Sequence, residues 1–199
     1  MTKFFILILL LFRVDCIGQI INAEDSFNYE IFKATGDLNN DNLPDRVVVS
    51  QDTLSDKSPY RLQIFFAEPN GKFKLIVTST KIIEPENPNG RDGYNSGNRF
   101  TDVTIKNGVV SINFELIRGH YEHKFRWQNG NFELIGFSEV YSDGKGEMET
   151  IDFNLSTGTR IEKTERYDTD KILSNKKKKI LIRPLPKLQD VIPMENELY

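Results

Sequence analysis

The sequence predicts a mainly β protein, in which antiparallel meander sheets form a sandwich or part of a propeller, with little helix. The composition is the first indication, because 14 phenylalanines and 7 tyrosines among 199 residues favour the pleated, half-buried surface of a sheet. The second is a series of turn pairs, such as Asn107-Gly108 and Asn129-Gly130, which reverse the chain at short intervals. The third is a two-residue alternation of apolar and polar side chains between these turns.

Taken in order, the alternating segments predict ten strands. Residues 109–117 show the pattern, because Val110, Ile112 and Phe114 share one face of an extended chain and the polar residues between them share the other. No segment has a sustained apolar period of 3.6 residues, so any helix is short and lies near residues 20–30 or 188–196. We expect strands at about 28–35, 46–52, 60–67, 73–83, 101–106, 109–117, 121–128, 132–141, 147–155 and 160–167.

A break in the alternation at residues 84–100 (EPENPNGRDGYNSGNRF) separates an N-terminal part, residues 19–83, from a C-terminal meander, residues 101–199. A loop of this length inside a compact domain is often functional. We expect the two parts to pack as one domain, because a chain of this size builds one good core. Near the end, the run Lys176–Lys179, followed by apolar residues and prolines, predicts an edge strand whose lysines prevent pairing with another sheet.

The first eighteen residues predict a secretory signal peptide. A lysine precedes an unbroken apolar run from Phe4 to Phe12, which suits an export signal and is shorter than the about 20 residues that cross a bilayer. Cleavage after Gly18 would leave Gln19 first and deliver the protein to the periplasm or the cell exterior. Cys16, the only cysteine, is an alternative lipid-anchor site, although small residues do not precede it as in bacterial lipoproteins. Without disulfides, the mature domain must be held by its core or by a metal.

The stretch GDLNNDNLPD, residues 36–45, places oxygen-bearing side chains at alternate positions. A calcium ion takes six to eight oxygen ligands, and a tight loop supplies them from its positions 1, 3, 5, 7 and 9. Three carboxylates in one short loop are costly to crowd together without a cation. The alternative is a solvated turn, since asparagine and aspartate favour turns for local reasons. We expect a Ca²⁺ site formed by Asp37, Asn39, Asp41, the main-chain carbonyl of Leu43, and Asp45.

This loop differs from the helix–loop–helix calcium motif at two positions. Asn42 replaces the glycine at position 6, and asparagine is the next best residue at positive φ. Val48 stands where a bidentate glutamate usually lies and begins a β-run, so the last carboxylate must come from Asp45. The pattern D-x-N-x-D-x-L-x-D, preceded by Lys33-Ala34-Thr35-Gly36 and followed by a valine-rich strand, resembles the calcium loop of FG-GAP and VCBS-type repeats. Such loops occur in integrin-like propeller blades and in small exported bacterial proteins that carry one loop.

The resemblance covers about residues 28–165 and implies an exported, calcium-binding β domain. Because the loop occurs once, it does not imply a complete propeller. The two histidines, His120 and His123, would point to opposite faces of a strand and so could not form a zinc pair. With no nucleophile or phosphate-binding motif either, we expect a non-enzymatic protein, and a net charge of −3 gives no reason to expect nucleic-acid binding.

The expected role is adhesion, or recognition of a protein or glycan partner, at the cell envelope. Two alternatives remain open. A glycan-binding or glycan-active module would use exposed aromatic residues such as Tyr94, Tyr121 or Trp127, and would lose its best residue if Trp127 were buried. An inhibitor of a periplasmic enzyme would use residues 84–100 as its contact loop.

Overall fold

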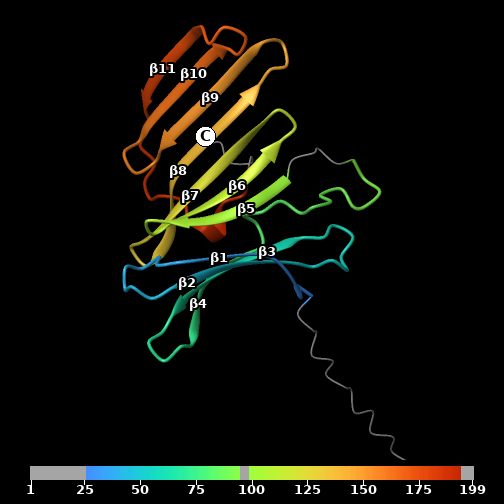
Figure 1. Ribbon diagram of the computed structural model, residues 1–199, viewed down its shortest axis with the longest axis vertical. Coiled ribbons are helices and arrows are strands. Elements are labelled where there is room, and N and C mark those ends of the chain that lie inside the picture. Colours follow the sequence, from blue (N-terminus) through green and yellow to red (C-terminus); the bar gives the residue numbers. More distant parts are fainter. Residues whose placement is uncertain (1–25, 95–98, 194–199) are drawn as a thin grey trace, which may run out of the picture.

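The protein consists of two antiparallel sheets, of four and seven strands, which confirms the mainly β class (Figure 1). The computed structural model describes residues 26–94 and 99–193. The signal peptide and Cys16 lie outside this part of the chain, as do residues 20–25 of the helix expected near 20–30. The described end of that range is no helix, because Tyr29 and Glu30 begin β1. The strands are β1 (Tyr29–Gly36), β2 (Asp45–Gln51), β3 (Tyr60–Ala67), β4 (Phe73–Ser79), β5 (Arg99–Lys106), β6 (Val109–Leu116), β7 (Gly119–Gln128), β8 (Asn131–Ser142), β9 (Glu147–Asn154), β10 (Thr159–Arg166) and β11 (Ile172–Lys179).

Each sheet is a meander, in which every strand pairs with its neighbour in the sequence. The four-stranded sheet has the order β1-β2-β3-β4, and the seven-stranded sheet has the order β11-β10-β9-β8-β7-β6-β5. The tight turns are those that the sequence predicts. Asn107 and Gly108 have φ values of 52° and 72°, and Asn129 and Gly130 have values of 53° and 74°, so both pairs adopt the left-handed backbone that two-residue hairpin turns require.

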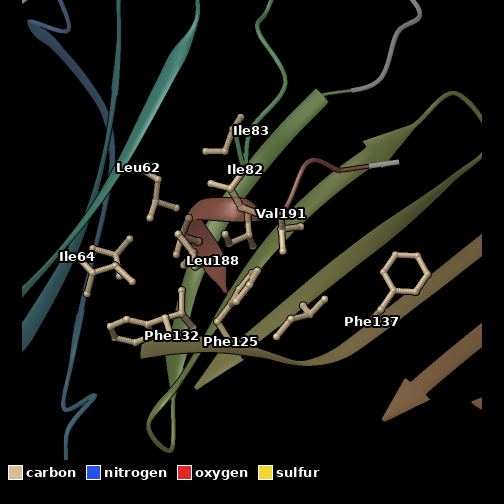
Figure 2. Packing of buried hydrophobic residues seen from close by; sticks show 14 of the residues in the cluster. Leu62, Ile64, Ile82, Ile83, Phe125, Phe132, Phe137, Leu188 and Val191 are labelled. Atoms are coloured by element: carbon tan, nitrogen blue, oxygen red, sulfur yellow. The ribbon is translucent and has the colours of Figure 1, made fainter. Parts of the chain in front are cut away.

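One hydrophobic core joins the two sheets (Figure 2). Leu62 and Ile64 of β3 face Phe125 of β7 and Phe132 of β8 across it, and all four side chains are buried. Their alternation along each strand places one face of each sheet inward. Aromatic side chains dominate the large-sheet side, and Phe125 is fully buried. Burying a side chain of this size contributes roughly 1.5–3 kcal/mol, so the contact between the sheets is the main source of stability.

The C-terminal segment returns between the sheets after β11. It contains a short 3₁₀ helix, η1 (Leu188–Asp190), which contacts β4 and β8. Leu188 and Val191 are buried in the core beside Ile82 and Phe125 (Figure 2). The amide of Leu134 donates to the carbonyl of Pro186 at 2.8 Å. The expected helix near residues 188–196 is therefore one 3₁₀ turn in its described part, and no α-helix occurs in residues 26–94 or 99–193.

Most strand boundaries lie within two residues of the expected ones, although β5 already begins at Arg99, inside the expected loop 84–100. Two differences are larger. The strand expected at 73–83 ends at Ser79, because the Ser79 hydroxyl accepts hydrogen bonds from the amides of Lys81 and Ile82 at 3.2 Å each. These bonds turn the chain, and Ile82 and Ile83 enter the core from outside a strand. The lysine run ends β11, the outermost strand of its sheet, whereas Ile180 and the two residues after it follow the strand.

Candidate metal centre

The loop between β1 and β2 lies where the two sheets meet. Leu38 is buried in the core, so the loop is anchored by an apolar side chain. The β5–β6 hairpin packs against it at two points. An added Cβ at Gly36 would approach Cγ2 of Ile105 on β5 to 2.6 Å, and the main-chain oxygen of Asp37 lies 3.9 Å from an ideal Cβ at Gly108 in the turn. Local sequence and packing therefore both fix the path of the loop.

The backbone of the loop wraps around the side chain of Asp37. Asp37 Oδ1 accepts hydrogen bonds from the amides of Asn40 at 2.8 Å and Asp41 at 3.3 Å, and Oδ2 accepts one from the amide of Asn42 at 2.9 Å. Asn40 and Asn42 have φ values of 63° and 65°. The expectation that Asn42 occupies the left-handed position is confirmed, and asparagine tolerates it better than most residues do.

Asn39 and Asp41 form a second set of contacts at the tip of the loop. The amide of Asp41 donates to Asn39 Oδ1 at 3.0 Å, and the side-chain nitrogen of Asn39 donates to Asp41 Oδ2 at 2.8 Å. Asp41 Oδ1 accepts from the amide of Leu43 at 2.8 Å. The side chain of Asp41 is exposed, whereas those of Asp37 and Asn39 are half-buried. Asp41 is therefore the acid with the most freedom to move within this loop.

Asp45 is the buried acid of the set, with no exposed surface. Its Oδ2 accepts from the amide of Leu38 at 2.8 Å, and its Oδ1 accepts from the amide of Ala67 at 2.8 Å. Burial raises the pKa of Asp45 above its ordinary value, the carboxylates of Asp41 and Asp37 raise it further, and the two backbone hydrogen bonds oppose the rise. The carboxylate thus ties the loop to the end of β3 in a region where its negative charge is unfavourable.

The chemistry of this oxygen set fits a hard cation. It combines three carboxylates with the amide oxygen of Asn39 and the carbonyl of Leu43, which accepts from the amide of Asp45 at 3.1 Å. A carboxylate has about four acceptor positions, so oxygens that already accept one backbone hydrogen bond retain capacity for a cation. Within residues 26–94 and 99–193, no three acidic, histidine or cysteine side chains already converge as a metal cluster.

Three parts of this arrangement carry no signal in the motif. Leu38 occupies a position at which the motif accepts any residue, so the motif does not predict its burial. The one local indication of an anchor is that an apolar residue stands inside an otherwise polar loop. The amide of Ala67 is 22 residues from Asp45, so only the strand pairing brings the two groups together. Asn40 is a second left-handed residue, and its asparagine side chain is the one local feature that indicates it.

The histidines and the expected glycan-binding aromatics are placed in different environments. His120 and His123 lie on β7, and His120 is exposed while His123 is buried. Tyr121 is also buried, and its ring stacks on Phe114 with centroids 4.4 Å apart. Trp127 is half-buried and contacts Phe66, with centroids 5.0 Å apart.

Tyr94, the third expected aromatic, is 77 % exposed. Of the three expected aromatics, Tyr94 alone is exposed, so their placement does not favour a shared stacking platform for sugar.

The segment after β4 is attached to the loop between β2 and β3. The amide of Asn87 donates to the carbonyl of Lys57 at 3.1 Å, and Gln51 Nε2 donates to Glu86 Oε2 at 2.6 Å. The amide of Arg91 donates to Asp56 Oδ1 at 3.2 Å. Residues 84–94 of the long break are therefore held in place by neighbouring loops.

Comparison of the chain with protein-family models, with curated proteins and with solved structures gave no match. No helix in residues 26–94 or 99–193 is long and apolar enough to cross a membrane.

Proposed function

We propose that this protein is an exported, non-enzymatic β domain whose β1–β2 loop binds Ca²⁺ through Asp37, Asn39, Asp41, the carbonyl of Leu43, and Asp45. The observation that carries the proposal is the fully buried carboxylate of Asp45, whose pKa is raised by burial and by two neighbouring carboxylates. An acid whose folded pKa is raised works against folding as the pH rises above its ordinary pKa, and the penalty is complete above the folded pKa. A divalent cation offsets this charge, and the loop supplies the oxygens that such a cation prefers.

The ion would have a structural role. Asp45 already connects the loop to β3 through Ala67, and Leu38 connects it to the core. Closing the set around a cation requires Asp41 to turn inward from the surface and exchange its bonds to Asn39 and Leu43 for the ion. Because this binding occurs only in the folded chain, its free energy adds to the stability of the sheet junction.

Recognition or adhesion at the cell envelope is the role that we propose for the domain as a whole. The export signal predicted at residues 1–18 and the resemblance of the loop to FG-GAP and VCBS-type repeats support it. Mass spectrometry of the protein recovered from the periplasm or medium of a bacterial host tests the export step. We expect a mature chain that begins at Gln19, whereas an intact N-terminus on a protein retained inside the cell would contradict export.

Thermal unfolding with Ca²⁺ and with a chelator tests the metal site. At free Ca²⁺ about 100-fold above the dissociation constant, the ion should stabilise the domain by about 2.7 kcal/mol, which corresponds to roughly 5–10 °C in Tm. Asp41→Asn should abolish this rise, because the amide still accepts from Leu43 but the charge is lost.

Asp170→Asn is the matched control. Asp170 is exposed, as Asp41 is, so the substitution removes one charge away from the loop and should leave the calcium response intact. Equal Tm values for the wild-type protein in Ca²⁺ and in chelator would overturn the proposal.

A further inference from the structure

A second site lies beside β5, the edge strand of the seven-stranded sheet that is opposite β11. A cavity of about 330 Å³ opens between the start of β3 and the strands β5, β6 and β7. This volume falls at the lower end of the range for small-molecule sites. The segment that leaves β4 forms its remaining wall, through Glu84, Pro85, Glu86 and Asn87.

The inner walls of the cavity are aromatic. Phe114 and Tyr121 are buried and form its base, while Tyr60 and Phe100 are half-buried and line its sides. The rings of Tyr60 and Phe100 lie 6.0 Å apart at an interplanar angle of 46°. They form a corner rather than a flat platform, so they suit a compact group, such as an ammonium or its methylated form, better than the flat face of a sugar ring.

The rim carries both signs of charge. Glu84 and Arg99 are exposed and line the cavity, and neither side chain forms a hydrogen bond or an ion pair with another described residue. Glu86 is held in place by the buried side chain of Gln51. Two carboxylates and one guanidinium thus lie at the same opening. Of these three groups, Glu86 is the one that is bonded to a described side chain of the fold.

The hydroxyl of Tyr60 shares this environment. Burial raises its pKa to about 12, the charge of Glu86 contributes to the rise, and the charge of Arg99 opposes it. The charges of Glu86 and Arg99 thus both act on the Tyr60 hydroxyl, and all three groups line the same cavity. At neutral pH the Tyr60 hydroxyl is protonated and is able to donate a hydrogen bond or accept one.

We propose that this cavity binds a small zwitterion, with its ammonium group in the corner of Tyr60 and Phe100 beside Glu84 and Glu86, and its carboxylate on Arg99. An ammonium is stabilised by ring faces and by carboxylates together, and a guanidinium matches the planar geometry of a carboxylate. A simple cation would be repelled by Arg99, and a simple anion by the two glutamates. The site does not depend on the calcium loop, so its failure and that of the calcium proposal are separate results.

Isothermal titration of the folded protein with glycine betaine, choline and glucose tests the proposal. We expect saturable binding of glycine betaine, binding of choline that is weaker by about tenfold or more because choline lacks the carboxylate, and no binding of glucose. Glu84→Gln and Arg99→Gln should each weaken glycine betaine binding by about tenfold or more. Both residues are exposed, so circular dichroism should show an unchanged fold.

Glu30→Gln is the control, because Glu30 is exposed on β1 outside the cavity and loses the same charge. It should change the affinity by less than about twofold. Three results would overturn the proposal: no saturable binding of glycine betaine, equal affinity for choline and glycine betaine, or unchanged affinity in both rim variants. Binding of glucose in place of glycine betaine would overturn it as well and would indicate a polyol site.

Discussion

The two ends of the seven-stranded sheet, β5 to β8 and β9 to β11, are stabilised in different ways. In the covered end, β7 presents Tyr121, His123 and Phe125 to the core, and all three are buried. In the uncovered end, no residue of β11 is buried, and seven of its eight residues are exposed. Figure 1 shows why, because β9, β10 and β11 extend beyond the four-stranded sheet, which covers only the neighbourhood of β5 to β8.

The uncovered end relies on backbone pairing and on charge. Glu162 on β10 accepts from Arg160 at 2.8 Å and from Lys178 on β11 at 2.7 Å. Ion pairs near the protein surface contribute about 0–1 kcal/mol each. The lysines at the end of β11 also oppose pairing of the free edge with another sheet. The comparison teaches that one continuous sheet can combine a packed core with an extension that depends mainly on its hydrogen-bond ladder.

The sharpest test of this difference is a pair of truncations. Phe125→Ala should lower the free energy of unfolding by about 3–5 kcal/mol, because it empties part of a packed core. Leu173→Ala on β11 should lower it by about 0.5 kcal/mol or less, because the side chain is already exposed. Chemical denaturation of both variants measures the contrast, and equal losses would show that the extension is packed in solution.

Acid should affect the covered end more than the uncovered one. Burial lowers the pKa of His123 to about 4, while the charge of Glu122 opposes the shift. The unfolded chain therefore binds a proton that the folded chain excludes, and stability that is complete at pH 7 is lost as the pH falls from about 6.5 to about 4. The loss amounts to about 3 kcal/mol.

His123→Phe should remove this pH dependence, since an aromatic ring is kept among Phe114, Tyr121 and Phe137. His120→Gln, on the exposed face of the same strand, serves as the control. Unfolding measured between pH 4 and pH 7 compares the two variants with the wild-type protein. If the free energy of unfolding of His123→Phe falls with decreasing pH as steeply as that of the wild-type protein, then His123 is not the source of the acid sensitivity.

The smallest effect is expected for the charges on the uncovered end. The hydrogen bonds of Lys178 and Arg160 hold the pKa of Glu162 below its ordinary value. The stability that Glu162 contributes is therefore present above that ordinary pKa and is lost as the pH falls through the folded value. Glu162→Gln should cost about 0.5 kcal/mol at low ionic strength and less at high salt. A loss of stability above about 1 kcal/mol that does not depend on salt would show that these ion pairs contribute more than surface pairs do.

Local sequence patterns predicted the parts of the fold that local physics decides. The hairpins around Asn107 and Asn129 follow from residues that tolerate positive φ, and the alternation around Phe114 and Phe125 reports a face that is buried in the sheet. The path of residues 180–193 could not be predicted in this way. Its burial depends on a space between two sheets that exists only after both have formed.

The two candidate sites differ in the same way, because only one of them is encoded in a continuous stretch of sequence. The calcium loop is one continuous stretch, so its spacing predicts the ligands and its asparagine at position 42 predicts the turn. The zwitterion cavity combines Tyr60 with Glu84 and Arg99, which come from three segments and carry no motif. Sequence reasoning identified Tyr121 as a surface aromatic, whereas the structure places its ring at the base of this cavity.

The burial of Leu188 and Val191 also has a consequence for how the chain matures. These residues complete the core, yet they follow all eleven strands of the described residues in the sequence. Domains generally fold as units while synthesis proceeds from the N-terminus, so the contacts of Leu188 and Val191 are the last part of this core that the ribosome supplies.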